Sequence, residues 1–215
     1  MLKAILLDIK PIQLYVFLTF FAAVIFYKPK SKTFKILLGI LLICSLNELL
    51  SLVLQFLHHR IGLLYSIMLF IHHSLWLLLL YKSTRHRHTF KMLYFAYAIF
   101  AVINLFFIEG FEDFNFSTFI IGSFLYLILF IYQSFYELKR ENFDFFQTNY
   151  YLLLFSPVLF LFGLSFVFGF KSAALATTKV FGEITLYEFI IYFVNIIYYS
   201  LINIYIYREK KLKHA

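Results

Sequence analysis

Long apolar runs alternate with short polar stretches along the whole chain. A helix needs about 20 apolar residues, at about 1.5 Å of rise each, to cross a hydrocarbon core about 30 Å thick. The runs are too long and too continuously apolar for barrel strands, and a helix satisfies its own backbone hydrogen bonds in lipid. Seven segments qualify as spanning helices, namely residues 12–27, 34–57, 61–81, 92–108, 116–136, 150–170 and 184–207.

Composition supports the same interpretation. Hydrophobic residues make up 63% of the 215-residue chain and charged residues only 14%, with a mean hydropathy of +0.85. About a quarter of the residues of a soluble globule are charged, so this chain lacks the polar surface that water requires. The connections are too short for a soluble domain, and no linker or repeat divides the chain. The sequence therefore predicts one all-α integral membrane domain over residues 1–215, a single seven-transmembrane-helix bundle whose solvent is the lipid bilayer.

Lys and Arg residues are concentrated in every second connection. Four clusters, at 28–35, 82–91, 139–140 and 208–213, hold most of the 19 basic residues. The opposite side holds Lys3, Lys10, Arg60, Lys171 and Lys179. Because cytoplasmic loops carry the excess of basic residues, the sequence predicts that the N-terminus is outside and the C-terminus cytoplasmic. We expect the membrane to be the cytoplasmic membrane of a bacterium.

The net charge of +8 does not indicate a nucleic-acid partner, because basic cytoplasmic loops are the ordinary topology signal. The single cysteine, Cys44, excludes an intramolecular disulfide and a cysteine-rich metal site. The seven histidines contain neither a His-Glu-x-x-His motif nor a pair four residues apart, so the sequence predicts no metal site and no cofactor. No nucleophile, base and orienting group can be placed together from spacing, which makes an enzyme the least favoured interpretation.

Polar residues inside the apolar runs are the candidates for function. A charge near the middle of a span costs about 2.5–3.5 kcal/mol, so Glu48 should face the bundle interior, be hydrogen-bonded or be protonated. His72 and His73 reach a similar depth on the next span, with Trp76 one turn away. Adjacent helical residues point about 100° apart, so we expect one imidazole to face the bundle interior and the other a neighbouring helix.

The last predicted helix has a longer polar strip. Its members are spaced by four, three, four and four residues and therefore share one face: Glu188, Tyr192, Asn195, Tyr199 and Asn203. Asn104 and Tyr126 reach the same depth on two further spans, and Pro157 should kink its helix and free a carbonyl.

These residues predict a ligand-binding pocket near the midplane. Its expected members are Glu48, His72, His73, Trp76, Asn104, Tyr126, Asn195 and Tyr199. The alternative is that Asn, Ser and His side chains join helices by hydrogen bonds worth about 0.6 kcal/mol each, in a bundle without a cavity.

In architecture alone, seven helices with an external N-terminus resemble microbial rhodopsins, G-protein-coupled receptors and SWEET sugar transporters. The sequence motifs of these families are absent. The last helix has no lysine for a Schiff base, and the run from Asn195 to Tyr199 lacks the proline of the receptor Asn-Pro-x-x-Tyr motif. The sequence therefore identifies no family.

Three functions remain open. The leading one is a membrane-embedded sensor or receptor-like module that binds a small ligand among its helices and signals through a separate cytoplasmic partner, because the chain has no output domain. The second is a small proton-coupled solute carrier, in which Glu48 and a midplane His exchange protons. The third is an accessory structural subunit of a membrane complex. The scarcity of helix breakers, three Pro and seven Gly, favours the sensor over the carrier.

Overall fold

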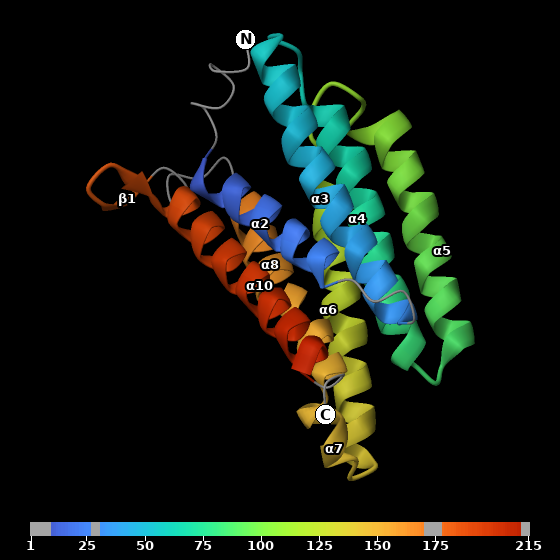
Figure 1. Cartoon of the computed structure of the whole chain (residues 1–215). Helices are drawn as coiled ribbons and strands as arrows, with labels where there is room; N and C mark the ends of the chain where they lie inside the picture. The colour runs from blue at the N-terminus through green and yellow to red at the C-terminus, as the bar shows by residue number, and fades with distance from the viewer. Residues whose placement is uncertain (1–9, 27–30, 170–177, 212–215) are drawn as a thin grey trace. The chain divides into compact units, whose positions relative to one another are not determined.

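The computed structural model describes residues 10–26, 31–169 and 178–211, which are helical apart from short connections and one hairpin (Figure 1). A π-helical turn, η1 (Asn104–Ile108), continues the helix that ends at Ile103. Strands β1 (Lys179–Phe181) and β2 (Ile184–Thr185) form an antiparallel hairpin. The α-helices are α2 (Pro11–Ile25), α3 (Lys32–Phe56), α4 (Gly62–Ser83), α5 (Arg87–Ile103), α6 (Phe116–Lys139), α7 (Phe143–Gln147), α8 (Asn149–Gly169) and α10 (Leu186–Lys211).

Six of the described helices are long and apolar enough to cross a membrane: α3, α4, α5 with η1, α6, α8 and α10. Their exposed side chains are largely Leu, Ile and Phe, which suit lipid and not water. The prediction of an all-α membrane protein is therefore confirmed. The first predicted span, residues 12–27, corresponds to α2, whose 15 residues reach about 22 Å at about 1.5 Å each, so seven spans remain a prediction.

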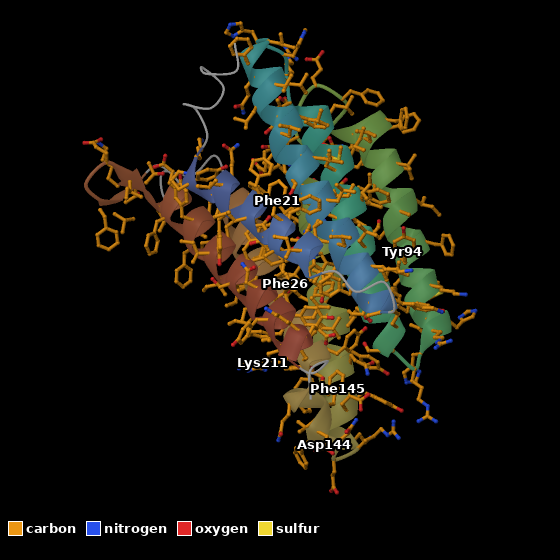
Figure 2. The ribbon with its side chains drawn as sticks, in the orientation of Figure 1. Phe21, Phe26, Tyr94, Asp144, Phe145 and Lys211 are labelled. Atoms are coloured by element: carbon orange, nitrogen blue, oxygen red, sulfur yellow. The ribbon has the colours of Figure 1, made fainter. Side chains whose placement is uncertain are left out.

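Helix α2 has a buried face and an apolar exposed face. Its exposed face includes Leu14, Leu18 and Phe21, spaced by four and three residues, each more than half exposed. Phe21 is labelled in Figure 2. A helix on a water-soluble protein carries polar residues on this outer face, so α2 also has the surface of a helix in contact with lipid.

Local sequence signals explain where α2 and α3 begin. Ser31 caps α3 by accepting a hydrogen bond from the backbone N–H of Phe34, at 3.3 Å. Pro11 occupies the first turn of α2, where its missing N–H costs nothing. The predicted ends at Tyr27 and Phe170 lie outside the described residues.

The start of the last helix differs from the prediction. Helix α10 begins at Leu186 and not at residue 184, because Ile184 and Thr185 pair with β1 around a turn in which Gly182 has a φ of +58°. The Glu188 carboxylate accepts hydrogen bonds from the backbone N–H and the hydroxyl of Thr185, at 3.0 and 3.1 Å, and Glu188 N–H donates back to that hydroxyl. Glu188, expected to begin a polar strip, is therefore one half of a helix-capping pair.

The chain divides into two compact units, residues 1–122 and residues 123–215, and α6 begins in the first and ends in the second. We describe each unit by itself. In the first unit, α3 packs against both α2 and α4, and α4 packs against α5. Its fully buried side chains include Leu37, Leu41, Trp76 and Leu80.

The second unit is built on the pairing of α8 with α10. Gly163 of α8 lies against Val194 of α10, and the rings of Phe160 and Tyr198 stack with their centroids 4.7 Å apart. Pro157, inside α8, cannot donate to the carbonyl of Leu153, which accepts instead from the Ser156 hydroxyl at 2.8 Å. Local side chains therefore compensate for the proline.

Candidate functional site

The residues expected to form one pocket are divided between the two units. Glu48, His72, His73, Trp76 and Asn104 lie in the first unit, and Tyr126, Asn195 and Tyr199 lie in the second. A single pocket formed by all eight remains a prediction.

The three residues of the second unit contact their own unit. The Tyr126 hydroxyl donates to the carbonyl of Leu154, one turn before Pro157, at 2.7 Å. The Asn195 side chain donates to the carbonyl of Ile191 on its own helix, at 2.8 Å. The ring of Tyr199 is buried and meets Tyr198 edge-on at 4.8 Å. These contacts stabilise helices and do not by themselves define a binding site.

Glu48 joins α3 to α2. Its Oε2 accepts a hydrogen bond from Nε2 of Gln13 at 2.9 Å, and Oε1 of Gln13 accepts from the backbone N–H of Lys10, also at 2.9 Å. Gln13 is buried, whereas Gln55, seven residues after Glu48 on the same face of α3, is exposed. The expectation that Glu48 is hydrogen-bonded is met, with a partner on α2 that spacing did not indicate.

The two adjacent histidines are both buried and make different contacts. His72 accepts at Nε2 from the indole N–H of Trp76, at 3.2 Å. Nδ1 of His73 lies 2.8 Å from the carbonyl oxygen of Leu69, and because a carbonyl only accepts, this nitrogen carries the proton. The His73 ring packs edge-on against Phe119 of α6, with centroids 5.1 Å apart.

His73 lines a crevice in the first unit between α4, α5, the start of α6 and the loop before it. The crevice is too narrow in this structure to admit a water molecule. Its walls combine aromatic rings with hydroxyl, amide and imidazole groups. The lining residues are Ser66, Leu69, Phe70, His73, Tyr97, Phe114, Asn115, Thr118 and Phe119.

Tyr97 brings a buried hydroxyl to this crevice. The residue is 3% exposed, and its hydroxyl has no hydrogen-bond partner among the described residues. A Cβ at Gly122 of α6 would lie only 2.6 Å from this oxygen and 3.0 Å from the His73 ring. Glycine is therefore required at this position for α5 and α4 to approach α6. An unsatisfied buried hydroxyl costs about 1–3 kcal/mol, which a ligand with a matching polar group could offset.

Hydrogen bonds anchor one end of the crevice. The Ser66 hydroxyl donates to the Gly62 carbonyl at 2.9 Å and accepts from the backbone N–H of Asn115 at 3.0 Å. A Cβ at Gly62 would lie 2.7 Å from the backbone of Asp113, so a glycine permits this close approach. The loop before α6 is thereby held against the start of α4.

A second polar network lies beside the crevice. The Asn104 side chain donates to Glu109 at 2.6 Å and to Thr118, a lining residue, at 2.8 Å. The Glu109 carboxylate also accepts from the backbone N–H and hydroxyl of Ser117, at 3.1 and 3.0 Å. Asn104 begins η1, and π-helical turns frequently occur at functional sites.

Sequence reasoning missed Tyr97, Asn115, Thr118 and Gly122. A signal for Tyr97 was present, because Tyr94, Tyr97, Ala101 and Asn104 are spaced by three, four and three residues and share one face of α5. No comparable pattern marks Asn115 or Thr118, whose role depends on the fold of a loop.

Within residues 10–26, 31–169 and 178–211, no three His, Cys, Asp or Glu side chains are close enough together to hold a metal ion. The aromatic, hydroxyl, amide and imidazole groups that line the crevice make it a candidate site for an organic ligand that forms aromatic contacts and hydrogen bonds. Comparison with protein-family models, curated proteins and solved structures finds no match to this chain.

Proposed function

We propose that this protein is a membrane-embedded sensor that binds a small ligand in the crevice between α4, α5 and α6 and signals through a separate cytoplasmic protein. The observation that supports this most directly is the buried Tyr97 hydroxyl, which lines the crevice and has no hydrogen-bond partner among the described residues. The aromatic lining favours a small ring-containing ligand with one polar group.

The narrowness of the crevice connects binding to movement. A ligand can enter only if α5 or α6 moves relative to α4, because the closed crevice does not admit even a water molecule. Binding then favours the displaced arrangement over the closed one, and that population shift is the signal that a partner would detect.

An accessory structural subunit is the second candidate. It is favoured by the internal hydrogen bonds of Glu48, Asn104, Tyr126 and Asn195, which join or stabilise helices without a ligand. An accessory subunit would co-purify with other membrane proteins in fixed stoichiometry and would show no saturable response to ligands.

We further propose seven spans, with the N-terminus outside and the C-terminus cytoplasmic, in the cytoplasmic membrane of a bacterium. The support is the excess of basic residues in alternate connections. Five of the counted basic residues lie outside the described part of the chain: Lys3, Lys28, Lys30, Lys171 and Lys213.

Cysteine labelling tests this topology. In a Cys44→Ser background, single cysteines at Ser31 and Arg85 should be protected from an impermeant thiol reagent in intact cells, whereas a cysteine at Glu112 should react. A cysteine at Lys10 distinguishes seven spans from six, because it is accessible from outside only if α2 crosses the membrane. Reaction at Ser31 together with protection at Glu112 would reverse the proposed orientation.

Tyr97→Phe tests the ligand site. Trp76 is the single tryptophan, fully buried and one turn from His72, so its fluorescence reports on this part of α4. We expect phenol and para-cresol, each a ring with one polar group, to change Trp76 fluorescence saturably in the purified protein, with excitation at the long-wavelength edge of tryptophan absorption, where neither probe absorbs. Tyr97→Phe should weaken this binding by about fivefold, because one hydrogen bond of about 1 kcal/mol is lost.

Tyr94→Phe is the matched control. Tyr94, labelled in Figure 2, lies one turn earlier on α5, and its hydroxyl donates to Ser74 and not to the crevice. This variant should bind both probes like the unmodified protein. Tyr97→Phe should raise thermal stability in the absence of ligand, because it removes a buried hydroxyl that has no hydrogen-bond partner among the described residues. Equal probe affinity in Tyr97→Phe and Tyr94→Phe would count against the crevice as the binding site.

A further inference from the structure

Cations gather at one end of the first unit, where α3 begins, α4 ends and α5 begins. Figure 1 shows these three helix ends side by side, and Figure 2 shows many nitrogen-bearing side chains there. All six Lys and Arg side chains at this end are exposed: Lys32, Lys35, Lys82, Arg85, Arg87 and Lys91. We call this set the basic end.

The described segments that form the basic end contain no acidic residue of their own. Segments 31–36 and 80–92 contain neither Asp nor Glu. The described acidic residues of the first unit lie elsewhere, with Glu48 in the middle of α3 and Glu109, Glu112 and Asp113 in the connection between η1 and α6. Like charges gathered at this end repel one another.

The start of α5 adds to this unfavourable electrostatics. A helix N-terminus carries a partial positive charge, and acidic or capping side chains normally occupy it. The first turn of α5 has no acidic residue and no side-chain cap, and Arg87 stands there instead. The C-terminus of α10 has the opposite arrangement, because Arg208, Lys210 and Lys211 lie at the negative end of that helix.

Aromatic packing orders part of the basic end. The Arg87 guanidinium lies over the Tyr81 ring at 5.8 Å, and that ring packs against Phe90 with centroids 5.5 Å apart. Stacking on a ring restricts the guanidinium while leaving its N–H donors available to oxygen ligands. Arginine in this arrangement is suited to bidentate contact with a phosphate group.

We propose that the basic end is a binding site for the phosphate headgroups of anionic phospholipids. A bilayer surface is the appropriate source of the anion because α3, α4 and α5 are apolar helices of spanning length, so their ends lie at the depth of the headgroups. Clusters of four to eight basic residues beside spanning helices bind anionic lipid at about 1 kcal/mol per cation. The bound phosphate offsets the repulsion among the cations and interacts favourably with the partial positive charge at the N-terminus of α5.

Native mass spectrometry of the purified full chain with a mixture of phosphatidylglycerol and phosphatidylcholine tests this proposal. The unmodified protein should retain phosphatidylglycerol in preference to phosphatidylcholine. Arg85→Gln with Arg87→Gln should lower the affinity for phosphatidylglycerol by about 30-fold, the equivalent of about 2 kcal/mol. Lys32→Gln with Lys82→Gln, which changes the other two helices of the site, should produce a similar decrease and provides a second test if the first variant does not fold.

The charge-matched control is Arg208→Gln with Lys210→Gln on α10, which should retain phosphatidylglycerol. Equal retention by a folded basic-end variant and the unmodified protein would overturn the proposal. An equal loss in the α10 control would also overturn it, because the effect would then come from net charge. Displacement of phosphatidylglycerol by inorganic phosphate at equal concentration would show that the site binds a soluble anion and not the lipid.

Discussion

Gly163→Ala should destabilise the second unit by about 1–3 kcal/mol. A Cβ at this position would lie 2.5 Å from Cγ1 of Val194, which is buried, and 3.6 Å from Ile190. The pairing of α8 with α10 is the most extensive helix contact described, so neither helix can move without disturbing the whole unit. Overpacking of this kind forces side chains from their rotamers or shifts the backbone.

Thermal unfolding in detergent micelles, followed by circular dichroism, measures this effect. The midpoint should fall by about 2–4 °C for each kcal/mol in a chain of this size. Gly169→Ala, at the end of the same helix, is the control, because a Cβ there would have no atom of the described residues within 4 Å. Adding Val194→Ala to Gly163→Ala should recover part of the lost thermal stability, because it removes the methyl group that the new Cβ would meet. If Gly163→Ala and Gly169→Ala unfold at the same temperature, α8 and α10 do not pack as described.

Gln13→Leu should lower the free energy of unfolding by about 2–3 kcal/mol, because it removes the amide that donates a hydrogen bond to the carboxyl group of Glu48. Glu48→Gln should cost less than about 1 kcal/mol, because its amide oxygen still accepts from Gln13. Replacing both residues by Leu should be less damaging than Gln13→Leu alone, because no polar group then remains without its partner. The free energies of unfolding of these variants form a double-mutant cycle for the α2–α3 contact.

The same cycle separates a structural role of Glu48 from a functional one. If Glu48 only joins α2 to α3, Glu48→Gln should leave both stability and the probe response of Trp76 unchanged. If the carboxyl group takes part in ligand response or proton exchange, Glu48→Gln should remain folded but lose that activity. Additive effects of Gln13→Leu and Glu48→Leu would contradict the hydrogen bond itself.

The two proposals for the first unit involve the same helices. The crevice uses Tyr97 of α5, and the basic end uses Arg87 and Lys91 at the start of that helix. A ligand that displaces α5 in the crevice would therefore also move the residues proposed to bind lipid phosphate.

Both the lipid solvent and the all-α class of this fold follow from the amino-acid sequence. Continuous apolar runs of spanning length require lipid, and lipid requires helices, so composition and run length suffice without knowledge of any contact. Local chemistry also predicted that Pro157 frees a carbonyl and that Glu48 faces the bundle interior, is hydrogen-bonded or is protonated. Ile184 and Thr185 were predicted to begin the last helix, but in the structure they form a strand that pairs with β1. The apolar pattern did not indicate this hairpin, because a hairpin depends on its turn and not on hydrophobicity alone.

Which polar side chains form hydrogen bonds with each other could be read only from the tertiary structure. Gln13 and Glu48 are 35 residues apart, and Ser66 and Asn115 are 49 residues apart. In a soluble helix, the polar face identifies the outer side and the apolar face the core. In this protein the lipid-facing side is as apolar as the core, so the pattern does not fix the rotation of each helix, and close packing at Gly122 and Gly163 fixes it instead.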